Sequence, residues 1–223
     1  MKTILFVQGL GMNKHEWHNS FDEIAGRLCN IGYNTVQFDF PIFFSGITRE
    51  LPLKKRAKFV EDIVGKSKSV GLIAQSYGAL TAMVAKLPTI KTQIFVSPAL
   101  SPMHSIRQVY EEVGVKINYK GDTIMPRSSG ENTTVGMEFW EDIKNFNDVK
   151  LARTITTPIC IFHGDEDSKV PVPTVQTFFD AIPVKRKKLK IYRGGDHGII
   201  DVPHLLREEF LQDVVKWFTE TLP

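Results

Sequence analysis

The stretch Ala74-Gln75-Ser76-Tyr77-Gly78 decides the fold of this chain. It lies between an apolar run, residues 70–74, and a helix-like stretch of small residues, 79–85. Alanine and glycine stand two positions to either side of the serine, where larger side chains would collide with neighbouring backbone in a tight turn. The pattern therefore predicts a sharp turn from a strand into a helix. Such a turn holds the Ser76 hydroxyl clear of the sheet and at a helix N-terminus, where free N–H groups favour developing negative charge.

Strand-like and helix-like segments alternate along the rest of the chain. This alternation predicts the α/β class, a three-layer α/β/α sandwich with a mostly parallel sheet of roughly six strands. Helical periodicity is clearest over residues 17–28, 53–64 and 206–218. The strands we expect are Thr3–Gln8, Thr35–Phe40, Val70–Gln75, Gln93–Ser97, Pro158–Phe162 and Leu189–Tyr192.

Residues 101–153 interrupt this alternation after the fourth strand, and they are richer in polar and turn residues. The segment is too long for a plain crossover, and it favours a small cap inserted into a single domain that spans residues 1–223. Within it we expect a helix over 105–113, strands over 115–119 and 122–125, and a helix over 137–145. Its apolar residues could line an acyl pocket or pack the cap onto the body: Tyr110, Ile117, Tyr119, Met125, Met137, Phe139 and Trp140.

The composition is that of an ordinary globular protein, with 42% hydrophobic and 24% charged residues. A formal net charge of +3 is too small to argue for nucleic acid as a partner. The apolar run Ile4–Val7 is too short for a signal peptide, and no stretch is long enough to span a membrane, so we expect a cytoplasmic protein. Cys29 and Cys160 lie in a predicted helix and a predicted strand, where we expect buried free thiols, with a disulfide as the alternative.

A nucleophilic serine needs a general base, and the base needs a carboxylate that orients it. Both kinds of residue follow later predicted strands, in the order serine, acid, histidine. The segment His163-Gly164-Asp165-Glu166-Asp167 follows the fifth strand, and Gly194-Gly195-Asp196-His197-Gly198 follows the sixth. The chain therefore has candidates for all three members of a catalytic triad.

In this order the motifs resemble those of the α/β-hydrolase fold superfamily, specifically its small serine esterases and peptidases. The resemblance runs from the first predicted strand to the last helix. Residues 163–171 match the pattern H-G-x-x-D-x-x-V-P, which implies Asp167 as the triad acid. Asp165 is the competitor, with loop capping or bonding to backbone N–H groups as its alternative role. The resemblance also implies His197 as the base and His163 as a buried structural histidine.

The same resemblance places the oxyanion hole in the loop Gln8-Gly9-Leu10-Gly11-Met12. Its donors would be the backbone N–H groups of Leu10 and Tyr77. The implied strand order is 2-1-3-4-5-6, which makes the first and third strands neighbours at the point where ligands bind in such sheets.

The chain departs from the family pattern at three positions close to this site. Ala74 opens the turn in place of glycine, and Gln8 and Gln75 stand where histidine is usual. None of the three belongs to the implied triad. We therefore expect altered hydrogen bonding around the site and unchanged chemistry.

These residues predict a serine hydrolase that cleaves small carboxylic esters through an acyl-enzyme on Ser76, without a cofactor. A serine at the turn argues against the epoxide-hydrolase and dehalogenase branches, which need aspartate there. A peptidase, a lactonase, a thioesterase and a non-catalytic ligand-binding protein remain alternatives. Residues 138–143 are similar to small cinnamoyl-type esterases, which favours a bulky or aromatic acyl group. His15 and His18 have the spacing of a metal pair, but without acidic or cysteine partners we expect no metal site.

Overall fold

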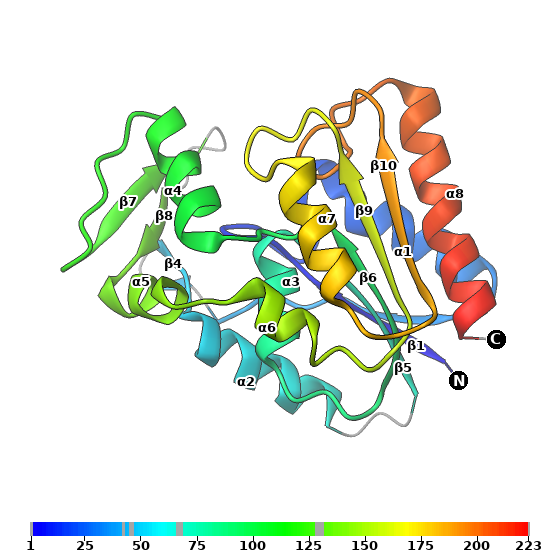
Figure 1. The fold of residues 1–223 in the computed structure, drawn as a ribbon. Coiled ribbons are helices and arrows are strands. Elements are labelled where there is room, and N and C mark those ends of the chain that lie inside the picture. The colour runs from blue at the N-terminus through cyan, green and yellow to red at the C-terminus, as the bar shows by residue number, and fades with distance from the viewer. Residues whose placement is uncertain (1, 42, 45–46, 66–68, 128–131, 223) are drawn as a thin grey trace.

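A computed structural model of the chain describes residues 2–41, 43–44, 47–65, 69–127 and 132–222. Its centre is a twisted parallel sheet flanked by helices (Figure 1). Within the described residues, the strands of this main sheet are β1 (Thr3–Val7), β2 (Asn34–Val36), β5 (Val70–Gln75), β6 (Ile90–Val96), β9 (Ile159–Gly164) and β10 (Lys187–Tyr192).

The strand order of the main sheet is β2-β1-β5-β6-β9-β10, and every neighbouring pair is parallel. In chain order this is 2-1-3-4-5-6, as predicted. The inner strands are buried on both faces, and every residue of β5 is buried. This explains why they read as continuous apolar runs in the sequence and not as alternating ones.

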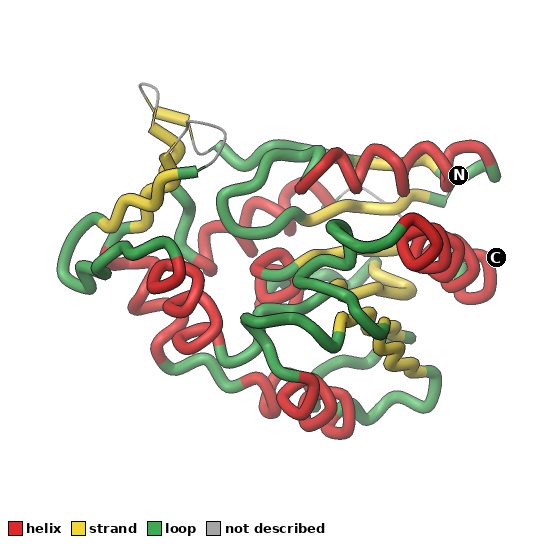
Figure 2. The backbone as a smooth tube through the Cα atoms, turned by 90° about the horizontal axis from the view of Figure 1, so that it is seen from above, coloured by secondary structure: helices red, strands yellow, loops and turns green. Residues whose placement is uncertain are grey.

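Helices cover both faces of the main sheet (Figure 2). Residues that alternate along each strand point to opposite faces, so the strands supply two separate cores. One core joins the sheet to α2, α3 and α7, and the other joins it to α1 and α8. These helices are α1 (Ser20–Asn30), α2 (Leu53–Val64), α3 (Tyr77–Val84), α7 (Val172–Ala181) and α8 (His204–Thr221).

Between β6 and β9 the chain forms a second layer of structure beside the main sheet (Figure 1). Its elements are α4 (Pro102–Glu112), β7 (Thr123–Pro126), β8 (Asn132–Val135) and α5 (Met137–Lys144), and α6 (Asp148–Ala152) then packs against α3 and α7 of the main body. Two strands from a distant part of the chain join it, β3 (Phe43–Phe44) and β4 (Ile47–Arg49). Together they form a small sheet with the order β3-β4-β8-β7, in which β4 and β8 are parallel.

Several predicted boundaries are wrong in this region and next to it. Residues 115–119 do not form a strand, because the backbone N–H and C=O of Asn118 bond to the Thr123 side chain in a turn. The second predicted strand, 35–40, ends at Val36. There the chain leaves the sheet, and the Gln8 side chain donates to the Phe38 carbonyl at 2.9 Å.

Of the two interpretations of the apolar cap residues, the structure supports packing. Tyr110, Met125, Phe139 and Trp140 are buried in one cluster with Tyr77 and Leu80 of α3. Tyr119 and Met137 are exposed, and Ile117 packs at the edge of the cluster. None of the seven lines the cavity described below.

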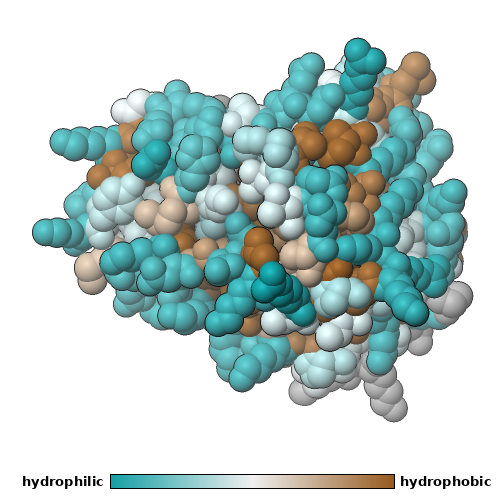
Figure 3. Space-filling view, viewed as in Figure 1, coloured by the Kyte–Doolittle hydropathy of each residue, from teal (hydrophilic) through white to brown (hydrophobic). Residues whose placement is uncertain are grey.

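The cysteines are both free thiols, but the expectation that both are buried is wrong for Cys29, which is exposed on α1. On the face drawn in Figure 3, apolar side chains form small separate patches among hydrophilic ones. Among the described helices, none is both long and apolar enough to span a bilayer.

Candidate active site

Ser76 occupies a strained turn between β5 and α3. Its backbone has φ 51° and ψ −117°, a conformation that non-glycine residues rarely adopt and that costs of order 1–3 kcal/mol. The turn is held because Ser76 N donates to Val96 O at 2.9 Å and Ser76 O accepts from Ala99 N at 3.2 Å. The Ser76 side chain consequently stands at the carboxyl end of the sheet and at the N-terminus of α3.

Close packing requires glycine at position 78, as predicted. A Cβ atom on Gly78 would lie 2.1 Å from the carbonyl oxygen of Val7 and 2.7 Å from that of Gln8. These contacts are with the backbone at the end of β1, which cannot move without disturbing the sheet. Ala74 is fully buried in the core on the α2 face.

His197 and Asp167 extend from Ser76 as a chain of hydrogen bonds. His197 Nε2 lies 2.9 Å from Ser76 Oγ, and His197 Nδ1 lies 2.8 Å from Asp167 Oδ2. The loop that carries His197 is anchored by Gly198 N, which donates to Ser97 Oγ at 3.2 Å. The structure thus brings together three side chains that are far apart in the sequence, in the geometry of a nucleophile, a base and an orienting acid.

The environment of Asp167 keeps its carboxylate ionised. Its Oδ1 atom accepts from the backbone N–H groups of Lys169 and Val170 at 2.8 and 3.1 Å. Burial alone would raise the pKa of Asp167, but the hydrogen bond from His197 and the nearby histidine charges outweigh it and hold the pKa below its ordinary value. Asp165 is exposed and takes no part in the hydrogen bonds that join Ser76, His197 and Asp167. Its Oδ1 instead accepts from Gly194 N at 2.6 Å.

His163 is buried and hydrogen-bonded, as predicted. Its Nε2 lies 2.8 Å from the carbonyl oxygen of Val170, and the side chain is fully enclosed. Burial lowers the pKa of His163, which favours the neutral ring. His163 therefore supports the loop that carries Asp167.

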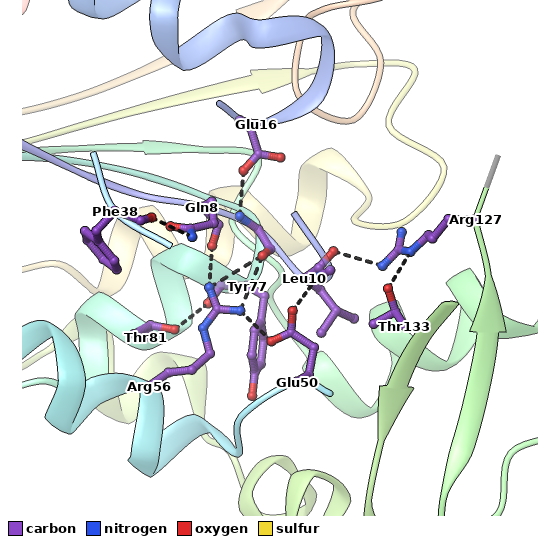
Figure 4. Close-up of polar contacts among 12 residues, drawn as sticks. Gln8, Leu10, Glu16, Phe38, Glu50, Arg56, Tyr77, Thr81, Arg127 and Thr133 are labelled. Atoms are coloured by element: carbon purple, nitrogen blue, oxygen red, sulfur yellow. Dashed lines mark hydrogen bonds and ion pairs between the residues drawn. The ribbon is translucent and has the colours of Figure 1, made fainter. Parts of the chain in front are cut away.

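The two predicted oxyanion donors lie beside Ser76. Leu10 and Tyr77 both line the cavity that contains Ser76. Among the described residues, neither Leu10 N nor Tyr77 N has a hydrogen-bond acceptor in the protein. The surrounding backbone groups of the Gln8–Gly11 loop are bonded to charged side chains (Figure 4).

Glu16 is a residue of this site that the sequence analysis missed. Its carboxylate accepts from Gly9 N at 2.6 Å, and its backbone has φ 60°. Burial raises the pKa of Glu16 to about 7, although hydrogen bonds from Gly9 and Trp17 and the charge of Arg56 act in the opposite direction. A lone glutamate in a polar stretch gives no sign in the sequence that it will be buried and bonded to the loop beside Ser76.

Arg56, Glu50 and Arg127 were missed as well. Arg56 did carry a signal, because the helical period over residues 53–64 places it on the apolar face of α2. A charged residue at such a position must find partners inside the protein. Arg56 is wholly buried and pairs with Glu50 at 3.0 Å.

A cavity of about 290 Å³ opens over Ser76 and His197. His15 and His18, whose spacing is that of a metal pair, do not line the cavity; His15 pairs with Asp22 and His18 with Asp201. The apolar lining of the cavity consists of Leu10, Met12, Trp17, Ala99, Ile106 and Val109, and its charged lining of Glu16, Arg127, Lys169, Asp196 and Asp201.

Comparison with solved structures supports the same fold. Est1E from Butyrivibrio proteoclasticus, solved with ferulic acid bound, superposes with a TM-score of 0.79 at 22% identity, covering 100% of this chain and 90% of Est1E. A monoacylglycerol lipase of Paleococcus ferrophilus superposes with a TM-score of 0.73 at 19% identity, covering 98% of this chain and 94% of the lipase. With the strand order and the turn at Ser76, these likenesses show that the chain has the α/β-hydrolase fold.

Sequence comparisons match shorter stretches. The family described as "Serine aminopeptidase, S33" matches residues 139–201, which include Asp167 and His197. A monoacylglycerol lipase of Mycolicibacterium smegmatis is 30% identical over 71 residues. That match covers 32% of this chain and only a quarter (25%) of the length of the curated lipase.

Proposed function

We propose that this protein is a serine hydrolase that cleaves carboxylic esters of small molecules. The observation that carries the proposal is the hydrogen-bonded chain from Ser76 through His197 to Asp167 at the floor of a largely apolar cavity. The esterase and lipases that resemble the chain are consistent with it.

In the proposed reaction, Ser76 Oγ attacks the acyl carbon while His197 Nε2 takes the serine proton. Asp167 holds the imidazole tautomer and stabilises its positive charge. The N–H groups of Leu10 and Tyr77 bind the developing oxyanion. His197 gives its proton to the leaving alcohol, and it then activates the water that releases the acid from Ser76.

The cavity also indicates the class of ester. Ile106 and Val109 come from α4 of the cap, and Ala99 lies just before that helix. An acyl chain or an aromatic ring would contact these side chains after its carbonyl reached Ser76. A volume of about 290 Å³ suits a compact acyl group, since pockets for drug-sized ligands start at about this size.

A serine peptidase is the second candidate, and one observation favours it. The acidic side chains of Asp196 and Asp201 line the cavity, where they could receive the amino group of a peptide, and the carboxyl of Glu16 lies beside them. The family match is to serine aminopeptidases. All three acids lie on the body of the fold, outside residues 101–153.

A parallel assay of two substrate series tests these proposals. One series consists of p-nitrophenyl esters of increasing acyl length, and the other of aminoacyl p-nitroanilides. Turnover of the esters that is lost in Ser76→Ala supports the esterase, and a preference for the anilides supports the peptidase. If neither series is turned over and Ser76 does not react with a fluorophosphonate, the result favours the alternative of a non-catalytic ligand-binding protein.

A further inference from the structure

Four ionisable side chains contact the loop Gln8–Gly11, and they come from different elements of the fold. Glu16 follows the loop, Glu50 precedes α2, Arg56 lies within α2, and Arg127 follows β7 in the cap. In Figure 4 they surround the loop. Burying several ionisable groups together is costly unless each one is paired or hydrogen-bonded.

The contacts involve successive peptide groups of the loop. The Gln8 carbonyl accepts from Arg56 Nη2 at 2.6 Å, and Gly9 N donates to Glu16 at 2.6 Å. The Gly9 carbonyl accepts from Arg56 Nη1 at 3.3 Å.

The peptide group between Leu10 and Gly11 is also held at both its C=O and its N–H. The Leu10 carbonyl accepts from Arg127 Nη2 at 3.0 Å, and Gly11 N donates to Glu50 at 2.6 Å. From the Gln8 carbonyl to Gly11 N, the Leu10 N–H is therefore the one polar backbone group without a partner among the described residues.

The direction of that N–H follows from the geometry of the peptide bond. The C=O and N–H of a trans peptide point in opposite directions. Because Arg56 draws the Gly9 carbonyl towards the core, the Leu10 N–H of the same peptide points away from Arg56. Leu10 lines the cavity on that other side, together with Ser76.

Arg56 also contacts the residue that carries the second donor. Its guanidinium carbon lies 4.9 Å from the centre of the Tyr77 ring and 3.9 Å from that of Phe40. Its Nη1 atom is bonded to Glu50 Oε2 at 3.0 Å, and the other oxygen of Glu50 holds Gly11 N. One buried ion pair thus joins both ends of the loop to the turn at Ser76.

We propose that Arg56 and Arg127 are positioning residues, which hold the Gly9 and Leu10 carbonyls so that the Leu10 N–H is fixed as an oxyanion donor beside Ser76. This inference rests on the proposed serine chemistry. A fixed donor stabilises the transition state without reorganising during the reaction, whereas a mobile one must first be ordered. The positive charges also polarise the peptide groups they bind, which strengthens the N–H as a donor.

The test measures how fast an alkyl fluorophosphonate reacts with Ser76, because this probe needs the oxyanion hole whichever substrate the enzyme prefers. Arg56→Lys keeps the charge but cannot bond two carbonyls and a carboxylate as a planar fork does. Removal of one oxyanion donor costs about 10²–10³-fold. For Arg56→Lys we expect the maximal inactivation rate, kinact, to fall about 10–100-fold, which does not exceed the cost of losing one donor. The probe concentration that gives half the maximal rate, KI, should stay unchanged.

Arg127→Met is the second variant, because Arg56 lies so deep in the core that its variant can fail to fold. We expect Arg127→Met to lower kinact as well, and Arg127→Lys to restore part of it. Arg49→Met is the matched control, since Arg49 forms an exposed pair with Asp122 in the same small sheet and does not contact the loop. Thermal unfolding of each variant shows whether it is folded.

The outcomes separate this inference from the proposed function. A folded Arg127→Met protein that matches Arg49→Met in kinact overturns the inference, and so does a change confined to KI. If the wild type reacts with the probe but hydrolyses no ester, the proposed substrate class is wrong while the role of the two arginines is still measured. A wild type that does not react with the probe overturns both.

Discussion

His197 Nδ1 lies 2.8 Å from Asp167 Oδ2, and the two residues come from the loops that follow the neighbouring strands β9 and β10. The loops approach closely because they contain glycines where they meet. A Cβ on Gly164 would lie 2.0 Å from the carbonyl oxygen of Gly195. The contact between acid and base therefore depends on backbone packing as well as on the two side chains.

This pairing predicts different effects for the two candidate acids. Asp167→Asn should lower kcat by about 10³-fold or more, because the amide no longer selects the tautomer of His197 or balances its charge. Asp165→Asn should leave kcat close to that of the wild type, since Asn can still accept from Gly194 N. Steady-state kinetics of both variants on one ester decides the assignment, which is wrong if Asp165→Asn is the more damaging change.

Ser76→Ala should lower kcat by about 10⁴-fold or more and leave the protein folded. The backbone bonds that hold the turn, to Val96 and Ala99, do not involve the hydroxyl. Circular dichroism and thermal unfolding should match the wild type while fluorophosphonate labelling disappears. Labelling that persists in Ser76→Ala would show that the probe reacts elsewhere.

Glu16 should make the stability of the protein depend on pH. In the unfolded chain this carboxyl ionises near its ordinary pKa of 4.5, but in the folded protein it stays protonated up to about pH 7. Between these values the unfolded state holds fewer protons, so this group lowers the free energy of unfolding as pH rises. The total loss is about 3 kcal/mol, and it levels off above pH 7.

Glu16→Gln removes this dependence, because its side chain does not titrate. Urea unfolding at pH 5 and pH 8 should therefore show a smaller difference between the two pH values in the variant than in the wild type. An equal difference in both proteins would show that Glu16 ionises normally in the folded state.

Two glycine substitutions should change the free energy of unfolding in opposite directions. Gly78→Ala places a methyl group against the backbone of β1 and should lower the free energy of unfolding by about 3 kcal/mol. Gly26 lies inside α1, where an added methyl group would meet open space, so Gly26→Ala should raise it by about 0.5–1 kcal/mol. Chemical denaturation measures both, and a Gly78→Ala protein as stable as the wild type would contradict the packing at the turn.

The main sheet and the side chains of Ser76, His197 and Asp167 could be predicted from the sequence, because each depends on a short continuous segment. Each inner strand is a continuous apolar run with one motif at its carboxyl end, and parallel strands bring those ends to one edge. The loops of Leu10, Asp167 and His197 could therefore be placed together before the structure was known. The roles expected for Asp167 and His163 were both implied by the resemblance of residues 163–171 to one family pattern.

The features that sequence reasoning missed depend on contacts between distant segments. The strand β8, with the sequence Asn132-Thr133-Thr134-Val135, and the two-residue strand β3 are too short to show a period. Val115, Ile117 and Tyr119 do alternate, yet the first two pack at the edge of the cap core from an irregular segment. The charged residues around Gln8–Gly11 lie up to 117 positions from the groups they bind.

The pairing of β4 with β8 affects how this protein can be recombined with its relatives. In the order β3-β4-β8-β7, removal of β3 and β4 would turn β8 into an open sheet edge, which invites aggregation. A chimaera that exchanges residues 101–153 alone would set the original β4 beside a foreign β8, and a failure of the two strands to pair would create such an edge. The residues from 41 to 50 must be transferred with them, so two segments that are separate in the gene form a single exchangeable module.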